Sequence, residues 1–213
     1  MIDSQQRGNT LVVGLGETGL SAAKFLAQRN ELACVIDSRA MPPGLDALRE
    51  AYPDVPVVLE SLDVAHLEGI ERLVLSPGLS VDLPLIAAAR ERGIVIASDI
   101  ELFARAADAP VVAVTGSNGK STVVTLTHQL LEKMGLHSAA GGNLGPPALD
   151  LLAERPEVFV LEVSSFQMEA TESLHPKVAA LLNVSADHLD RHGSFERYAE
   201  LKRKLIDAAE MAV

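Results

Sequence analysis

The residues best suited to chemistry form one short segment, Thr115-Gly116-Ser117-Asn118-Gly119-Lys120-Ser121-Thr122. It follows the apolar run Val111–Val114 and precedes a helical stretch, so its amides and the Lys120 ammonium can surround phosphate oxygens while the Ser121 hydroxyl faces a magnesium ion. The segment departs from the usual G-x-x-x-x-G-K-[ST] pattern because Val114 stands where the first glycine is expected. We predict a shortened phosphate loop.

Two further groups of polar residues follow apolar runs in the same half of the chain. Glu162 ends the run Val158–Val163, where a carboxylate beside a phosphate loop can hold Mg²⁺ directly or through water. His188 lies in the loop Asp187–His192, and either a metal or substrate contact or a structural role fits it equally well. We expect His192 to lie at the surface.

A second glycine-rich loop, Gly14-Leu15-Gly16-Glu17-Thr18-Gly19, lies near the start of the chain. It also joins an apolar run to a helical stretch, and Asp37 follows at about the 20-residue distance typical of a ribose-binding carboxylate. Arg39 could face a phosphate, and Ser76-Pro77-Gly78 forms another loop after an apolar run. The pattern predicts a dinucleotide or a nucleoside diphosphate ligand.

These loops require parallel strands that end at one edge of a sheet. Strand-length apolar runs alternate with amphipathic stretches, which is typical of an α/β protein. The expected strands are Leu11–Val13, Ala33–Ile36, Val57–Leu59, Leu73–Leu75 and Ile94–Ile96, with helices at Gly19–Arg29 and Leu83–Arg92. The first part of the chain is therefore predicted to be a Rossmann-like open parallel sheet.

The segment Arg105–Pro110 turns to small residues and ends in Ala-Pro, so we place the domain boundary after residue 107. The domain 108–213 is predicted to be a P-loop NTPase-type α/β domain. Its expected strands are Val111–Val114, Val158–Val163 and Val178–Val184, and its expected helices are Lys120–Met134 and Phe195–Glu210. Because so few strands cannot cover their apolar faces, we expect this domain to be truncated.

Composition narrows the possible partners and compartment. The chain has 213 residues and a formal net charge of −11, which disfavours nucleic acid and anionic membrane surfaces as partners. Its one cysteine, Cys34, allows no internal disulfide. The N-terminus lacks an apolar run as long as that of a signal peptide, and no later apolar run is long enough to span a membrane. We expect a cytoplasmic monomer without membrane insertion.

Taken together, these motifs resemble the Mur ligases, in particular the member that adds D-glutamate. The resemblance spans nearly the whole chain. Its carriers are the two glycine loops, Ser76–Gly78, Gly141-Gly142-Asn143-Leu144-Gly145, Leu161-Glu162-Val163-Ser164-Ser165-Phe166-Gln167, Asn183 and Asp187–Arg191.

The resemblance implies a role for each matched position. The first domain would bind the uridine diphosphate of a substrate rather than NAD, through Gly14, Gly16, Thr18, Gly19, Asp37, Arg39, Ser76 and Gly78. ATP would bind at Gly116, Ser117, Asn118, Gly119, Lys120, Ser121 and Thr122. Substrate contacts would also come from Asn143, Ser164, Gln167 and His188.

The resemblance further implies two Mg²⁺ ions, one held by Ser121 and Glu162 and the other by His188 and a carbamylated Lys202. The catalytic residues would be Lys120, Glu162, His188 and Lys202. ATP would phosphorylate the carboxylate of UDP-N-acetylmuramoyl-L-alanine, and D-glutamate would attack the acyl phosphate in peptidoglycan precursor synthesis. Because the D-glutamate site belongs to a third domain, we expect these 213 residues to be inactive alone.

Three alternatives remain open from the sequence. The first glycine loop with Asp37 also fits an NAD-dependent oxidoreductase, which leaves the loop at Lys120 unexplained. A non-catalytic nucleotide-binding fragment fits the expected truncation. Folylpolyglutamate synthetases share the second type of loop, but they lack the first domain.

Overall fold

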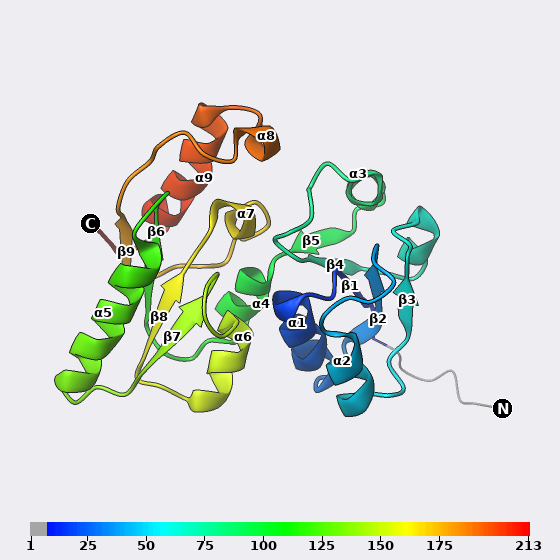
Figure 1. The fold of residues 1–213 in the computed structure, drawn as a ribbon, viewed down its shortest axis with the longest axis horizontal. Coiled ribbons are helices and arrows are strands. Elements are labelled where there is room, and N and C mark those ends of the chain that lie inside the picture. Colours follow the sequence, from blue (N-terminus) through cyan, green and yellow to red (C-terminus); the bar gives the residue numbers. More distant parts are fainter. Residues whose placement is uncertain (1–7) are drawn as a thin grey trace. The chain divides into compact units, whose positions relative to one another are not determined.

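The computed structural model describes residues 8–213, which form two compact units, one ending at Asp99 and the other starting at Ile100 (Figure 1). We expected the first domain to run to residue 107, whereas helix α4 (Asp99–Ala106) belongs almost wholly to the second unit. Side-chain contacts explain this grouping. The ring of Phe103 on α4 packs edge-on against Phe159 of that unit, with their centroids 5.0 Å apart.

The first unit contains a five-stranded, fully parallel sheet with the order β3-β2-β1-β4-β5. Its strands are β1 (Thr10–Val13), β2 (Leu32–Asp37), β3 (Val57–Leu59), β4 (Arg72–Leu75) and β5 (Val95–Ala97). Its helices are α1 (Glu17–Ala27), α2 (Leu45–Ala51), the 3₁₀ helix η1 (Val64–Leu67) and α3 (Pro84–Glu91). The Rossmann-like expectation is confirmed, and each expected strand lies within two residues of an observed one.

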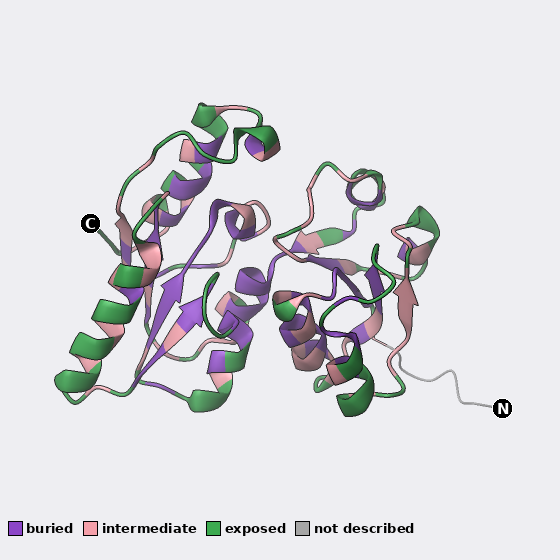
Figure 2. Ribbon diagram, in the orientation of Figure 1, coloured by how far each residue is buried: buried purple, intermediate pink, exposed green. Residues whose placement is uncertain are grey.

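The central strand β1 is buried along its whole length, whereas the edge strands β3 and β5 are only partly buried (Figure 2). Leu11 and Val13 pack with Ile36, Leu73 and Ile86 in one cluster. A parallel strand covered on both faces is apolar at successive positions, which is why these runs could be recognised in the sequence.

The second unit also contains a five-stranded parallel sheet, with the order β10-β9-β6-β8-β7. Its strands are β6 (Val111–Thr115), β7 (Ser138–Gly142), β8 (Val158–Glu162), β9 (Val178–Leu181) and β10 (Met211–Ala212). Its other helices are α5 (Lys120–Lys133), α6 (Ala148–Leu151), the 3₁₀ helix η2 (Leu152–Glu154), α7 (Ser165–Met168), α8 (Leu189–His192) and α9 (Phe195–Asp207).

The sheet of the second unit has more strands than we expected, because β7 and β10 were missed. The sequence of β7 is Ser-Ala-Ala-Gly-Gly, which lacks the β-branched and aromatic residues that mark a strand. Pairing with β8 holds it in the sheet. Within residues 8–213, no helix combines the length and apolar character that a membrane crossing requires.

Candidate functional sites

The glycine loop Gly14–Gly19 joins β1 to α1, and its glycines differ in what they require. A Cβ at Gly19 would lie 1.8 Å from the carbonyl oxygen of Gly14, so helix and loop can pack only with glycine there. A Cβ at Gly16 would meet no protein atom within 4 Å, and this residue precedes α1 without a side-chain cap. Gly16 is therefore open to a ligand, whereas Gly19 serves packing.

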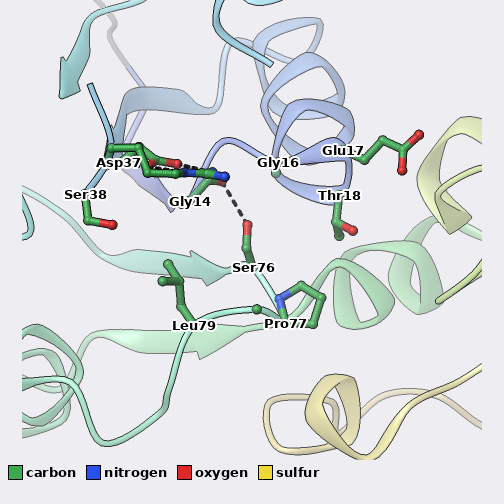
Figure 3. Close-up of a pocket in the computed structure, with 12 residues that line it drawn as sticks. Gly14, Gly16, Glu17, Thr18, Asp37, Ser38, Ser76, Pro77 and Leu79 are labelled. Carbon is green, nitrogen blue, oxygen red and sulfur yellow. Dashed lines mark hydrogen bonds and ion pairs between the residues drawn. The ribbon is translucent and has the colours of Figure 1, made fainter. Parts of the chain in front are cut away.

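A pocket of about 350 Å³ lies over this loop (Figure 3). Strands β1, β2 and β4 end at it, so it forms where the carboxyl ends of parallel strands meet. It brings together all the expected residues of the first unit, namely Gly14, Gly16, Thr18, Gly19, Asp37, Arg39, Ser76 and Gly78. The hydroxyl of Ser76 donates to the carbonyl oxygen of Gly14 over 2.8 Å.

Asp37 has no free lone pair in this pocket. Its Oδ2 accepts from the Leu15 amide (2.6 Å) and from Arg39 NH2 (2.7 Å), while Oδ1 accepts from the amide and Nε of Arg39 (2.8 and 2.9 Å). Burial would raise its pKa, but these hydrogen bonds outweigh burial and lower the pKa to about 2. Asp37 therefore holds the glycine loop and Arg39 in place, and a ribose hydroxyl would have to displace one of these donors.

The phosphate loop joins β6 to α5 in the second unit. Gly119 caps α5 with φ 86°, a conformation that favours glycine. Lys120 Nζ donates to the carbonyl oxygens of Gly116 and Ser117, at 3.0 and 3.2 Å. The lysine thus lies folded over its own loop, and it would have to turn from these carbonyl oxygens to reach a phosphate.

Asn183 follows β9, the strand that pairs with β6, and forms hydrogen bonds to this loop. Its carbonyl oxygen accepts from the Ser117 amide and its Oδ1 accepts from the Asn118 amide, both over 3.0 Å. Its Nδ2 donates to the Asn118 carbonyl oxygen, also over 3.0 Å. We assigned Asn183 no role from the sequence, because only the pairing of β6 with β9 brings it to the loop.

Glu162 lies beside the phosphate loop, as predicted. Strands β6 and β8 pair Val114 with Glu162, and the hydroxyl of Ser121 donates to Glu162 Oε2 over 2.7 Å. The other oxygen, Oε1, accepts from Asn143 Nδ2 over 2.8 Å. A hydroxyl and a carboxylate oxygen are hard donors, so this pair fits Mg²⁺.

Of the four expected metal ligands, only Glu162 and His188 are of the residue types that usually gather at a metal site. Among residues 8–213, no three His, Cys, Asp or Glu side chains gather closely enough to hold a metal ion. His188 is about half exposed, with its Nε2 3.5 Å from Asp187 Oδ2. A cation at Glu162 or His188 would need further oxygen from hydroxyl groups, phosphate or water.

Lys202 is buried, with 2% of its surface exposed, and reaches the phosphate loop from α9. Its Nζ donates to the Gly116 carbonyl oxygen over 2.8 Å and lies 4.5 Å from the centroid of the Tyr198 ring. Burial and then the charge of Lys120 lower its pKa to about 8, although Asp187 and Glu162 oppose the shift. Lys202 therefore loses its proton to give the neutral amine more readily than an exposed lysine does.

A smaller pocket of about 150 Å³ joins many of these groups, and it is lined by Gly116, Ser117, Lys120, Asn143, Ser164, Ser165, Phe166, Asp187, His188, Tyr198 and Lys202. Of the other expected residues, Ser121 is hydrogen-bonded to Glu162 and Asn118 is hydrogen-bonded to Asn183. Gly119 caps α5. Thr122 is exposed in the first turn of α5.

Gln167 has a structural role that we did not expect. It closes a capping box at the start of α7, in which the Ser164 hydroxyl accepts from the Gln167 amide and Gln167 Oε1 accepts from the Ser164 amide. Gln167 is buried and is absent from the pocket lining, whereas Ser164 lines it.

Two family models match the chain, one to each unit. Residues 8–98 match "Mur ligase MurD-like, N-terminal domain", and residues 114–213 match "Mur ligase middle domain". The chain belongs to the Mur ligase family. It is 48% identical to the UDP-N-acetylmuramoylalanine–D-glutamate ligase of Marinobacter nauticus, over 96% of this chain and 46% of that protein.

Other Mur ligases support the same assignment. The ligase of the same name from Pseudomonas putida is 47% identical over 95% of this chain and 45% of its own length. The chain thus spans about half the length of the curated relatives it matches.

Two solved Mur ligases have the same fold. A UDP-N-acetylmuramate:L-alanyl-gamma-D-glutamyl-meso-diaminopimelate ligase from Neisseria meningitides has a TM-score of 0.60 at 17% identity, covering 94% of this chain and 68% of that chain. A UDP-N-acetylmuramate-alanine ligase from Thermotoga maritima has a TM-score of 0.56 at 19% identity, covering 96% of this chain and 48% of that chain.

Within this Mur ligase chain, Tyr198 and Ser185 are further site residues that the sequence did not single out. The hydroxyls of Tyr198 and Ser117 are 2.9 Å apart, and Ser117 Oγ also accepts from the Ser185 amide. The position of Tyr198, one helical turn before Lys202, was the available signal, because residues four apart share a helix face.

Proposed function

We propose that the full-length protein containing this chain is an ATP-dependent ligase that adds D-glutamate to UDP-N-acetylmuramoyl-L-alanine in peptidoglycan precursor synthesis. The observation that carries this proposal is the hydrogen bond between Ser121 and Glu162 beside Lys120, which supports a cation site next to a phosphate loop. The identity to ligases of this name over nearly the whole chain supports the choice of substrate.

The first unit, which ends at Asp99, is proposed to bind the uridine diphosphate of the substrate. Support comes from the open space over Gly16 and from the half-exposed Arg39 guanidinium in a pocket of about 350 Å³. Helix N-termini and guanidinium groups are well suited to phosphates. Thr18, Ser76 and Gly78 complete the proposed contacts.

The second unit, which starts at Ile100, is proposed to bind ATP through Gly116–Thr122. Lys120 would turn from its loop carbonyls to the β and γ phosphates and neutralise charge as the γ-phosphoryl group moves to the substrate carboxylate. The product of this step is an acyl phosphate. The amine of D-glutamate then attacks the acyl carbon, an amide bond forms as the nitrogen gives up a proton, and phosphate leaves with the electron pair of the broken C–O bond.

Two Mg²⁺ ions would be held by this domain, one by Ser121 and Glu162 and the other by His188 and a carbamylated Lys202. When bound, the ions would supply charge neutralisation on the phosphates. The lowered pKa of Lys202 supports carbamylation, because only a neutral amine captures carbon dioxide. Asn143, Ser164 and His188 line the adjoining pocket and are proposed to orient the acceptor, with Gln167 acting through its cap on Ser164.

We further propose that D-glutamate binds outside these 213 residues, so that this chain alone does not turn over. We propose a monomer that works in the cytoplasm. A non-catalytic nucleotide-binding role is the competing proposal, and turnover by the full-length protein separates the two.

The oxidoreductase alternative has no support beyond the glycine loop. The four lone-pair positions of Asp37 are already filled by Leu15 and Arg39. Calorimetry of the chain with UDP and with NADH tests the point, and binding of UDP alone is expected.

The ligase proposal is tested on the full-length protein by phosphate release from ATP. Release is expected to require both UDP-N-acetylmuramoyl-L-alanine and D-glutamate, and Lys120→Ala should reduce it by a factor on the order of 100 or more. Phosphate release that is independent of D-glutamate, or equal turnover by Lys120→Ala, would contradict the proposal.

A further inference from the structure

His192 lies at the end of α8 with its side chain fully buried, contrary to our expectation of a surface position. Its side chain has no exposed area because α7 and α9 cover it. It lies four residues after His188, which lines the pocket at the phosphate loop. Burying an imidazole costs free energy unless its nitrogen atoms have polar partners.

The partners of His192 come from both ends of α7. Its Nε2 lies 3.0 Å from the hydroxyl of Ser165, the first residue of that helix. Its Nδ1 lies 3.2 Å from Oε1 of Glu169, the residue that caps the helix, although without the alignment of a good hydrogen bond. The imidazole of His192 thus lies between the Ser165 hydroxyl and the Glu169 carboxylate and contacts both.

This order of groups selects one form of the imidazole. Burial is the main cause that lowers the pKa of His192, followed in the same direction by Arg191 and His188, while Glu169 opposes the shift. The carboxylate of Glu169 favours the proton on Nδ1, so Nε2 accepts from the Ser165 hydroxyl.

The same contacts anchor α8 to α7. Arg191 NH2 donates to Glu169 Oε2 over 2.8 Å, and the rings of His192 and Phe166 stack with an interplanar angle of 24° and centroids 5.0 Å apart. At the other end of α8, the His188 ring lies 4.9 Å from Phe166. His188 has a φ of 51°, a left-handed conformation that surrounding contacts must maintain in a histidine.

We infer that Ser165, His192 and Glu169 form a buried positioning relay that fixes α8 on α7 and thereby holds His188 and Ser164 in the geometry required for ligation. This inference rests on the proposed function. His192 and Glu169 are positioning residues, because neither is among the residues that line the 150 Å³ pocket at the phosphate loop.

Two substitutions of His192 separate the relay from simple packing, measured in the full-length protein. His192→Phe keeps an aromatic ring against Phe166 but removes both nitrogen atoms, whereas His192→Gln can still accept from Ser165 and donate to Glu169. The matched control is His137→Phe, which makes the same change at an exposed histidine. ADP affinity, melting temperature, kcat and KM for each substrate are measured for all variants.

The relay predicts that His192→Phe lowers kcat by about tenfold or more, with ADP affinity and the KM for ATP unchanged. His192→Gln should recover a large part of the loss, because its side chain can still accept from Ser165. A kcat for His192→Phe equal to that of the control would overturn the relay, as would equal losses in the Phe and Gln variants.

Nitrogen NMR of the histidine rings tests the relay without turnover, so its failure is distinct from failure of the proposed ligase. The expected spectrum of His192 shows a proton on Nδ1 and none on Nε2, and Glu169→Gln should perturb it. A His192 protonated on Nε2 or on both nitrogens near pH 7 would overturn the relay even in an active ligase. Inactive wild-type protein with the expected spectrum would count against the ligase proposal alone.

Discussion

Lys120 and Lys202 donate hydrogen bonds to the same atom, the carbonyl oxygen of Gly116, over 3.0 and 2.8 Å. Two cationic side chains, one from α5 and one from α9, thus converge on the phosphate loop of a chain whose formal net charge is −11. Their mutual repulsion contributes to the lowered pKa of Lys202. A polyphosphate would be attracted to this point by local charge, against the overall field of the protein.

Replacing Lys202 by methionine should preserve the fold and abolish the reaction. Lys202→Met removes a buried ammonium group and its repulsion with Lys120, so the melting temperature is expected to stay equal or rise. If a carbamylated Lys202 holds a metal ion, ligation by the full-length variant should fall by about 100-fold or more.

The modification itself can be followed by carbon NMR with labelled bicarbonate. A carbamate signal is expected in the wild-type protein and should be missing in Lys202→Met. Wild-type turnover by Lys202→Met would remove Lys202 from the mechanism.

Two glycine-to-alanine changes in one loop should affect different properties, ligand binding for Gly16 and stability for Gly19. Gly16→Ala adds a methyl group where no protein atom lies within 4 Å, so stability should stay unchanged while calorimetry shows UDP affinity reduced by about tenfold or more. Gly19→Ala forces a carbon atom to within 1.8 Å of the Gly14 oxygen and should destabilise the first unit by about 1–3 kcal/mol in urea unfolding. Normal UDP binding by Gly16→Ala would show that the ligand does not approach this loop.

Glu101 should stabilise the second unit in a pH-dependent manner. Burial would raise its pKa, but hydrogen bonds from the Ser173 hydroxyl, the Glu172 and Ser173 amides and Arg105 lower it from 4.5 to about 2. Because the folded-state pKa is depressed, the stabilisation is complete above about pH 5 and is lost as the pH falls through 4.5 towards 2.

Glu101→Gln is accordingly expected to lower the free energy of unfolding by about 2–3 kcal/mol at pH 7. The difference from wild type should shrink at about pH 3.5 in urea unfolding. The exposed Glu154→Gln serves as the control and should change stability by less than about 0.5 kcal/mol at either pH. A difference that grew on acidification would contradict the assigned pKa shift.

Asn183 should order the phosphate loop. Asn183→Ala removes both side-chain hydrogen bonds to the Asn118 peptide, so amide exchange at Ser117 and Asn118 should accelerate and ADP affinity should fall by about three- to tenfold. Gln129→Ala on the exposed face of α5 is the matched amide control. If Asn183→Ala instead binds ADP more tightly, Asn183 occupies the place of the phosphate rather than supporting the loop.

Local pattern was sufficient for much of this protein. Strands such as β1 and β6 are buried on both faces and therefore read as unbroken apolar runs, and the glycine loops lie between a strand and a helix within a few residues. From these features the α/β class, the candidate phosphate loop and the meeting of Gly14, Asp37 and Ser76 at one sheet edge could be predicted. Strand β7 could not, because its alanines and glycines carry no strand signal.

The partners of the polar side chains were decided by the tertiary structure. Lys202 lies 86 residues from Gly116 in the chain, and His192 lies 27 residues from Ser165, yet each pair is hydrogen-bonded. No period in the sequence encodes such contacts, because they depend on strand order and on how α8 and α9 pack. Burial then decides what each group does, since the same lysine or histidine on the surface would be an ordinary solvated cation or imidazole.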